Sequence, residues 1–330
     1  MLITVNSSDI RAAFQDMKPL FKAADTCNAL GFTVHDYVLY ITCNAGVVYE
    51  RQVAVDQAGP YTITVLYQDL SEIIPARGVL SIDLEPLFVE ISSEFMSATL
   101  QQANGIVSRY KQRSSSFEPI NPAMVQTMAD LFSNSTTVSK ALKREAPITL
   151  KPPYARMEFA TFWLECENPL LDMTINLTHL KALAAFKPTE FSTSEDAVEF
   201  RNGPAILAIP RNAPVPSLCV QDLLKDPITC GVMQSNTYLT RIQQFWRSVG
   251  AGECRCHLYT DGLDIVVSRP RVQSHLKIGA CTELITSFST FIEYVQMLFT
   301  IIGTSPVEVI RGNNYLCLRT PTASMLLSTL

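Results

Sequence analysis

Cys254, Cys256 and His257 lie within four residues of one another, and thiolates and imidazoles are common zinc ligands. The chain has no second pair of such ligands at zinc spacing. The two cysteines alternate with Arg255 and His257, as the two faces of a single strand would. We therefore expect buried thiols at this position and no metal site.

A second group with catalytic residue types is the acidic pair Glu165 and Glu167. Their spacing places both on one face of a strand, which favours a solvated rim over an acid and base pair. No nucleophile elbow, Walker A loop or dinucleotide-binding glycine motif accompanies the four histidines, His35, His179, His257 and His275. The sequence thus predicts a protein that is not an enzyme and uses no cofactor.

Composition narrows the class of protein further. The 330 residues are 47% hydrophobic and 17% charged, which excludes a disordered chain, and the formal charge of −5 excludes DNA binding by bulk positive charge. Nine scattered cysteines indicate buried thiols in a reducing compartment. The longest apolar stretch, 288–302, is interrupted by Glu293 and Gln296, and residues 1–10 do not resemble a signal peptide. We expect a soluble, cytoplasmic protein with no membrane segment.

A repeat of about 110 residues organises the chain. Three segments each consist of a strand, a short amphipathic helix and further strands, and Leu70, Leu180 and Phe291 occupy equivalent positions in them. A short strand, a polar cap and a longer helix occur in 1–23 and again in 231–249. The pattern predicts helices over 8–23, 67–77, 122–145, 177–187, 236–249 and 288–302.

Two of these helices have apolar stripes at helical spacing. Their members are Ile10, Ala13, Phe14, Met17 and Phe21 in the first, and Tyr238, Ile242, Phe245, Trp246 and Val249 in the other. Each helix precedes a predicted hairpin, one turning at His35-Asp36 and one at Asp261-Gly262, where glycine tolerates a positive φ.

The predicted fold class is α+β, with three repeated domains in which two helices cover one face of an antiparallel sheet. Proline-rich stretches near 114–122 and 210–227 are typical of links between domains. We expect the domains to span 1–118, 119–225 and 226–330.

The order and spacing of these elements over the whole chain resemble the bacterial-type DNA polymerase sliding clamp, the beta-clamp family. Phe117-Glu-Pro stands where the family often has an Asp-Phe-Pro turn, and 324–330 corresponds to its terminal strand. The chain is shorter than cellular members of this family usually are and diverges from them, which favours a clamp of phage or viral type that acts in a bacterial or infected cell. Such a clamp is a homodimeric ring of six domains around double-stranded DNA, and its partners are a DNA polymerase, a clamp loader and repair factors.

In this family paired helices line the hole and contact phosphates without reading sequence. The predicted helices carry a small net positive charge, whereas the rest of the chain is acidic. The first helix has a polar stripe of Arg11, Gln15, Lys18 and Lys22. The candidate DNA-binding residues are Arg11, Lys18, Lys22, Arg77, Lys140, Lys143, Arg144, Lys181, Lys187, Arg241 and Arg247.

Partners of the family insert a short peptide with apolar anchors between the second and third domains. Carried over by position, this pocket comprises Leu170, Leu171, Ile209, Pro210, Arg211, Met325, Leu326 and Leu327. Cys166-Glu-Asn-Pro-Leu170 replaces the Thr-Asp-Gly-His-Arg-like turn of the family, which indicates a different peptide. For each of Met325, Leu326 and Leu327 taken singly, a role in the core of an edge strand is an equally good interpretation.

Two other functions are compatible with the pattern. One is a processivity factor that grips DNA along a basic face without closing into a ring, and the other is a structural or assembly protein built from repeated α+β modules. Salt-dependent retention on DNA regardless of free ends favours the first, and open-ended assembly without an effect on DNA favours the second.

Overall fold

The computed structural model describes residues 1–23, 29–66, 74–75, 77–103, 105–134, 146–158, 162–212, 220–224, 226–234, 238–302 and 306–329. The chain forms two compact units, each assembled from two separate stretches of sequence. Unit 1 comprises residues 1–126 and 178–212, and unit 2 comprises 127–177 and 213–330.

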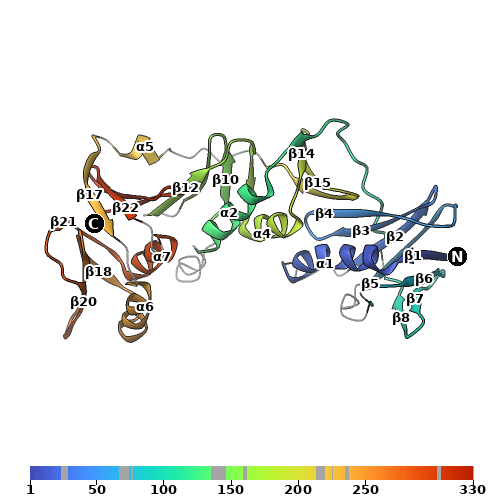
Figure 1. The fold of residues 1–330 in the computed structure, drawn as a ribbon, viewed down its shortest axis with the longest axis horizontal. Helices are drawn as coiled ribbons and strands as arrows, with labels where there is room; N and C mark the ends of the chain where they lie inside the picture. Colours follow the sequence, from blue (N-terminus) through green and yellow to red (C-terminus); the bar gives the residue numbers. More distant parts are fainter. Residues whose placement is uncertain are drawn as a thin grey trace. The chain divides into compact units, whose positions relative to one another are not determined.

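Unit 1 contains two antiparallel sheets (Figure 1). The four-stranded sheet has the order β1 (Leu2–Asn6), β6 (Val79–Leu84), β7 (Phe88–Ser93) and β8 (Met96–Gln101). The eight-stranded sheet has the order β5 (Tyr61–Leu66), β2 (Ala29–His35), β3 (Val38–Asn44), β4 (Val48–Ala54), β16 (Ala205–Pro210), β15 (Ala197–Asn202), β14 (Glu190–Thr193) and β9 (Glu118–Pro119).

Unit 2 likewise contains one four-stranded and one eight-stranded antiparallel sheet. The smaller has the order β20 (Val272–Gly279), β19 (Gly262–Arg269), β18 (Glu253–Tyr259) and β21 (Leu284–Phe291). The larger has the order β13 (Met173–Ile175), β10 (Ile148–Lys151), β11 (Tyr154–Glu158), β12 (Phe162–Glu167), β24 (Ser324–Ser328), β23 (Tyr315–Arg319), β22 (Pro306–Arg311) and β17 (Ile228–Gln234).

The strand orders show two kinds of four-stranded arrangement, and each kind occurs three times. A meander of three strands is extended by the strand that follows it in sequence in β2-β3-β4 with β5, in β10-β11-β12 with β13, and in β18-β19-β20 with β21. A second kind of meander is extended by an earlier strand in β6-β7-β8 with β1, in β14-β15-β16 with β9, and in β22-β23-β24 with β17. The predicted α+β class is confirmed, and the limits 1–118, 119–225 and 226–330 stay a prediction.

Each eight-stranded sheet contains one strand pairing that crosses a predicted domain boundary. β4 pairs with β16, where Tyr49 lies opposite Leu207, and β12 pairs with β24, where Trp163 lies opposite Leu326. We call these pairings junction 1 and junction 2. The sequence did not predict them, because hydrophobic alternation shows which face of a strand is buried but not which distant strand lies beside it.

The described helices are α1 (Ser7–Ala23), α2 (Pro122–Ser133), α4 (Leu177–Phe186), α5 (Val220–Leu223), α6 (Tyr238–Val249) and α7 (Ile292–Ile302). Asn121 caps α2 by accepting a hydrogen bond from the Ala123 amide at 2.9 Å, and proline suits the first turn. None of these helices is long and apolar enough to cross a membrane.

Two helix predictions need correction. The helix expected over 288–302 begins only at Ile292, because 288–291 still belong to β21 and pair with β18. Of the helix expected over 67–77, the described residues 74, 75 and 77 are not helical, and the others lie outside the described residues, as do 135–145 of the helix expected over 122–145.

The predicted apolar stripes are buried in most of their described positions. On α1, Ile10, Ala13, Phe14 and Met17 are inaccessible to solvent, while the Phe21 side chain lies outside the described residues. On α6, Tyr238, Ile242 and Val249 are buried, whereas Phe245 and Trp246 are half-buried. Each helix therefore packs through one face, and the opposite face is available to solvent.

Both hairpin turns lie one residue away from their predicted positions. The β2–β3 turn is formed by Asp36 and Tyr37, with φ of 49° and 62°, as a tight two-residue turn requires. The β18–β19 turn is Thr260 and Asp261, and Gly262 already belongs to β19. Glycine is needed at 262 for space, because a Cβ there would lie 2.6 Å from the Cys281 Sγ.

Candidate functional site

In unit 1, α1 and α4 lie side by side on one face of junction 1 (Figure 1). The fully buried Tyr49 of β4 donates a hydrogen bond from its hydroxyl to Asp16 Oδ2 on α1 at 3.0 Å. Its ring also meets that of Phe186 on α4 edge to face, with 6.1 Å between centroids. One side chain therefore contacts both helices, so α1 and α4 cover the same face of the eight-stranded sheet.

A small polar network fixes α1 at this place. Arg51 of β4 donates from Nη1 to the same oxygen of Asp16 at 3.2 Å. Burial raises the pKa of Asp16, and the hydrogen bond from Tyr49 and the charge of Arg51 oppose that rise. Burial likewise raises the pKa of Tyr49, so the phenol stays protonated and remains a donor.

Four predicted DNA-binding residues lie on or beside these two helices. Arg11 and Lys18 of α1 are half-buried, and Arg11 Nη1 donates to the Ile74 carbonyl at 3.3 Å. Lys181 is exposed on α4. Lys187 follows the last turn of α4 with φ of 53°, and its amide donates to the Leu183 and Ala184 carbonyls, which closes the helix.

The other predicted DNA-binding residues divide into three sets. Arg241 and Arg247 are exposed on α6 in unit 2. Arg77 is exposed but lies in a bend rather than in the predicted helix. The Lys22 side chain, Lys140, Lys143 and Arg144 lie outside the described residues.

In unit 2, an apolar cluster lies between α5 and one face of junction 2. Leu326 of β24 is completely buried against Val220, Leu224, Ile310 and Cys317. Trp163, Leu223 and Tyr315 lie partly buried at the margin of this cluster, and the Trp163 and Tyr315 rings meet edge to face at 5.6 Å. The cluster places a predicted pocket residue beneath α5.

The other predicted pocket residues of unit 2 are distributed differently. Met325 and Leu327 are also completely buried, but strand alternation turns them to the sheet face opposite Leu326. Leu171 is buried in a turn in which the side-chain Nδ2 of Asn168 donates to its carbonyl at 2.7 Å, whereas Leu170 is 39% exposed. Of these four residues, Leu170 alone offers an accessible apolar side chain.

The remaining three predicted pocket residues belong to unit 1. Ile209 is buried in β16, Pro210 is exposed at the end of that strand, and the half-buried Arg211 donates its amide to the Asp196 carbonyl at 2.8 Å. Their part in a pocket stays a prediction.

A cavity of about 180 Å³ lies beside the apolar cluster of junction 2, lined by Tyr154, Glu165, Cys166, Val220, Arg319 and Ser324 among others. Burial raises the pKa of Cys166 to about 12, so this thiol is neutral. Val220 and Arg319 were not predicted from the sequence, although the apolar run after the prolines of 214–216 was a signal for a packed segment.

One prediction at this cavity was wrong. Glu165 was expected on a solvated rim, but it is 5% exposed and forms an ion pair with Arg156 Nε at 2.6 Å. The pairing of β12 with β24 covers this end of the strand, and Arg156 lies directly opposite Glu165 on β11. A buried carboxylate needs such a partner.

The Cys254 and Cys256 side chains share the buried face of β18, with 3.6 Å between their sulfur atoms, as the alternation predicted. Across the described part of the chain, no three His, Cys, Asp or Glu side chains are grouped as a metal site requires.

The architecture of this chain is similar to that of solved structures. No protein-family model and no curated protein matches the sequence. Among solved structures, the DNA polymerase III subunit beta from Pseudomonas aeruginosa superposes with a TM-score of 0.76 at 13% identity, over the full length of both chains. Pol III beta from Caulobacter crescentus gives 0.74 at 10%, also over both full chains.

This chain has the sliding-clamp fold. The resemblance predicted from the repeat is therefore confirmed at the level of architecture. The beta clamp of Helicobacter pylori bound to a DNA ligase peptide is a further structure of this kind, with a TM-score of 0.71 and 10% identity over both full chains.

Proposed function

We propose that the protein is a DNA polymerase processivity factor, a sliding clamp that encircles duplex DNA as a homodimeric ring. The observation that carries this proposal is the three-fold strand motif together with the sliding-clamp fold. Two meanders of the first kind end in β4 and β12, and each of these strands pairs with the last strand of a meander of the second kind, β16 or β24.

Among the strands that the structure describes, one of each kind has no such partner. β20 ends the remaining meander of the first kind, β8 ends the remaining meander of the second kind, and each is the edge of its sheet as described. We infer that β20 of one copy pairs with β8 of another. Two copies then make six equivalent junctions, and the assembly closes with two-fold symmetry.

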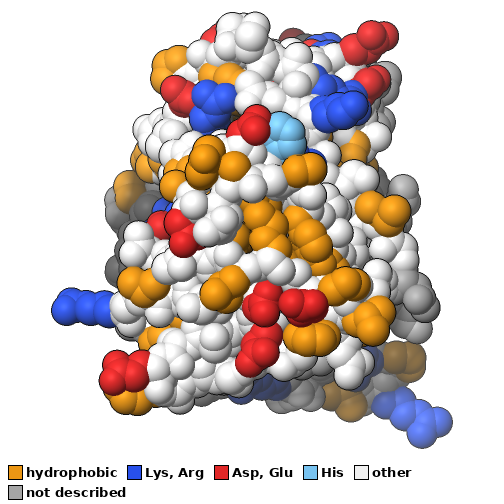
Figure 2. Space-filling view, turned by 90° about the vertical axis from the view of Figure 1, so that its right-hand side faces the viewer, with side chains coloured by type: hydrophobic (Ala, Val, Ile, Leu, Met, Phe, Trp, Pro, Cys, Tyr) orange, Lys and Arg blue, Asp and Glu red, His pale blue; other side chains and the backbone are white. Residues whose placement is uncertain are grey.

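The side chains near these two edges suit one another. Phe95, in the turn before β8, is 87% exposed beside Glu94. Arg271 lies in the turn before β20, which begins at the exposed Val272 and contains Lys277. The end of unit 1 that carries β1 and β6–β8 shows apolar side chains next to a group of acidic ones (Figure 2). An acidic, partly apolar edge fits a basic, partly apolar edge.

The basic side chains of the helices provide the contact with DNA in this proposal. Arg11, Lys18, Lys181 and Lys187 act from α1 and α4, Arg241 and Arg247 act from α6, and Lys22, Arg77, Lys140, Lys143 and Arg144 add to them. Few and flexible contacts to phosphate hold the duplex loosely and read no sequence, so the ring slides.

Partner binding is assigned to junction 2. A peptide with apolar anchors enters beside α5, between the rings of Trp163 and Tyr315 and the side chain of Leu170, with Leu326 beneath it. Leu171, Met325 and Leu327 are buried and support this surface from within unit 2. The occupants are a DNA polymerase, a clamp loader and repair proteins, and the clamp works in the cytoplasm of a bacterial or infected cell. It is a scaffold without catalysis.

Electron microscopy of the purified protein tests ring formation. Particles with a central hole and a pseudo-six-fold outline are expected, and Phe95→Asp should convert them to single chains. Leu87→Ala is the control, because Leu87 is exposed just before β7 and this change removes apolar surface without adding a charge. Particles without a hole would overturn the ring.

Retention on DNA tests encirclement. A ring should remain on nicked circular plasmid in high salt and leave the same plasmid within minutes of linearisation. Lys181→Glu with Arg241→Glu should weaken retention while unfolding stays unchanged, because both side chains are exposed. Equal loss from circular and linear DNA would favour an open factor instead.

A further inference from the structure

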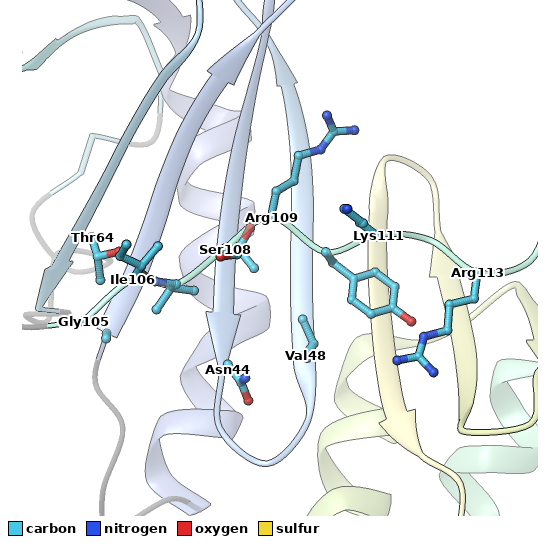
Figure 3. A pocket seen from close by; sticks show the side chains of 13 residues that line it. Asn44, Val48, Thr64, Gly105, Ile106, Ser108, Arg109, Lys111 and Arg113 are labelled. Carbon is cyan, nitrogen blue, oxygen red and sulfur yellow. Dashed lines mark hydrogen bonds between the residues drawn. The ribbon is translucent and has the colours of Figure 1, made fainter.

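A cavity of about 610 Å³ opens on the face of unit 1 that lies opposite α1 and α4. Its floor is the eight-stranded sheet, at Thr42 and Asn44 of β3 and Val48 of β4. Its wall is formed by residues 105–111 and Arg113 of the segment 105–117, here called the connector, which crosses the strands of this sheet (Figure 3). The volume falls in the range of sites that bind ligands or peptide side chains.

Two buried carboxylates hold the connector in place. Glu50 Oε2 accepts a hydrogen bond from the Tyr110 amide at 2.6 Å and one from the Thr42 hydroxyl at 3.1 Å. Glu199 Oε1 accepts from the Tyr110 hydroxyl and from the Arg113 amide, each at 2.7 Å. Since Glu50 is 3% exposed and Glu199 is fully buried, the connector is anchored and the cavity is preformed.

The sheet also lets the connector lie unusually close. A Cβ at Gly31 of β2 would lie 2.4 Å from the Val107 carbonyl oxygen, so only glycine permits this approach. The Val107 amide then donates to the Thr64 Oγ1 at 2.9 Å. The wall of the cavity is thus fixed at both of its ends.

Three cations follow one another along the connector at every second residue. Arg109, Lys111 and Arg113 are all exposed, and none of the described residues that line the cavity is acidic. The Arg109 guanidinium lies over the Tyr40 ring, 3.5 Å from its centroid, and Arg113 forms an ion pair with Asp196, so both side chains are held in position. Lys111 lies between them.

An apolar side chain completes the lining. Ile106 is 81% exposed at the cavity and lies beside Thr64 of β5 (Figure 3). An isoleucine this open to water on an anchored segment gains free energy when an apolar group covers it. The lining therefore combines positive charge with an apolar contact.

We propose that this cavity docks an extended acidic peptide segment of a partner protein, with carboxylates facing Arg109 and Lys111 and an apolar anchor against Ile106. In extended chains, alternate residues recur about every 6.6 Å on one side, so two acidic residues at alternate positions match Arg109 and Lys111. The site is separate from junction 2 and from the basic helices.

A nucleic acid fits the same surface less well. Single strands bind through aromatic side chains on which bases stack. Among the described lining residues only Tyr110 is aromatic, and its hydroxyl is committed to Glu199. The nearby Tyr40 ring is already covered by Arg109.

Fluorescence anisotropy with the full chain tests the proposal. The probe is the fluorescein-labelled peptide Glu-Asp-Leu-Glu-Phe-Asp-Glu, and the comparison probe carries Gln and Asn in place of its acids. Lys111→Glu should weaken binding of the acidic peptide about tenfold, as reversal of a charge at an interface does. Ile106→Ser should weaken it about fivefold through lost apolar contact.

Lys151→Glu is the matched control, because it makes the same charge change at an exposed residue of unit 2. It should leave binding unchanged, and Lys111→Glu should leave retention on circular DNA unchanged. Equal binding of the amide peptide, or equal binding by Lys111→Glu, would overturn the proposal. So would the absence of any binding, or displacement of the peptide by an equimolar single-stranded oligonucleotide.

Discussion

Junctions 1 and 2 are both antiparallel strand pairings, but they are covered by different elements that are held by different interactions. At junction 1 the face opposite the helices is covered by the connector, which is held by hydrogen bonds to the buried carboxylates of Glu50 and Glu199. At junction 2 the corresponding face is covered by α5, which packs Val220 and Leu224 on Leu326. A repeated backbone motif thus carries two different kinds of surface chemistry, one directional and polar, the other apolar.

This difference changes what each junction can bind. Apolar packing is tolerant of small displacements, so the cover of junction 2 suits a peptide that inserts apolar anchors. Hydrogen bonds to a buried carboxylate fix the connector in one position, because an unpaired buried acceptor is costly. Junction 1 therefore suits recognition by charges held in fixed places.

Among substitutions that disturb the elements covering the two junctions, the largest loss of stability is expected at junction 2. Leu326→Ala removes a completely buried side chain from the apolar cluster and should lower the free energy of unfolding by about 3 kcal/mol. Chemical denaturation measures this loss, with the exposed Leu284→Ala as the control in the same unit. Equal stability of the two variants would show that the cluster does not hold α5.

At junction 1, Glu199→Ala should cost about 2 kcal/mol, because it leaves the Tyr110 hydroxyl and the Arg113 amide without their buried acceptor. Hydrogen exchange of the β15 and β16 amides reports the loss locally. Trypsin should also cut faster after Arg109, Lys111 and Arg113. The exposed Glu195→Ala controls for the loss of one acid, and unchanged trypsin cleavage would contradict the anchoring role.

A smaller change sharpens the comparison without touching a hydrogen bond. Gly31→Ala should destabilise unit 1 by about 1 kcal/mol, because the new methyl group forces Val107 away from β2. Binding of the acidic peptide should fall as the cavity wall shifts. Ser108→Ala, a change at an exposed connector residue, serves as the control, and a Gly31→Ala variant that binds normally would show that the close approach is dispensable.

The smallest effect distinguishes the junctions by pH. Burial raises the pKa of Glu50 above its ordinary value of 4.5, against the hydrogen bonds from Tyr110 and Thr42. The folded state then binds this proton more tightly than the unfolded state, so the free energy of unfolding falls as the pH rises from 4.5 through the folded-state pKa. Glu50→Gln should flatten that fall by a few tenths of a kcal/mol.

Junction 2 should show no matching change in acid. Burial raises the pKa of Cys166 and of Cys317 to about 12, so their linked loss of stability begins only when unfolded thiols ionise, in alkaline solution. Denaturation at a series of pH values measures both trends. An unaltered acid slope in Glu50→Gln would remove Glu50 from the explanation and leave Asp16, whose pKa is also raised by burial.

The sequence predicted local structure well and long-range pairing poorly. The apolar stripe of α1 and the alternation of Cys254 and Cys256 depend on neighbours in the chain, so the periodicity of the residues was sufficient to find them. Glu165 was expected on a solvated rim, and Glu50 and Glu199 were not singled out, because the burial of all three comes from strands and segments far away in sequence. The same limit concealed the connector cavity and the role of α5.

The pairing of β4 with β16 has a consequence for how the protein is made. Val48 and its partner Ala208 are far apart in the chain, so β4 is synthesised long before the strand that completes its sheet. At ribosomal speeds of about 5–20 residues per second, the apolar edge of β4 waits on the order of 10 to 30 s for its neighbour. During translation the nascent chain therefore presents an open strand edge, which is a substrate for chaperones and a template for aggregation.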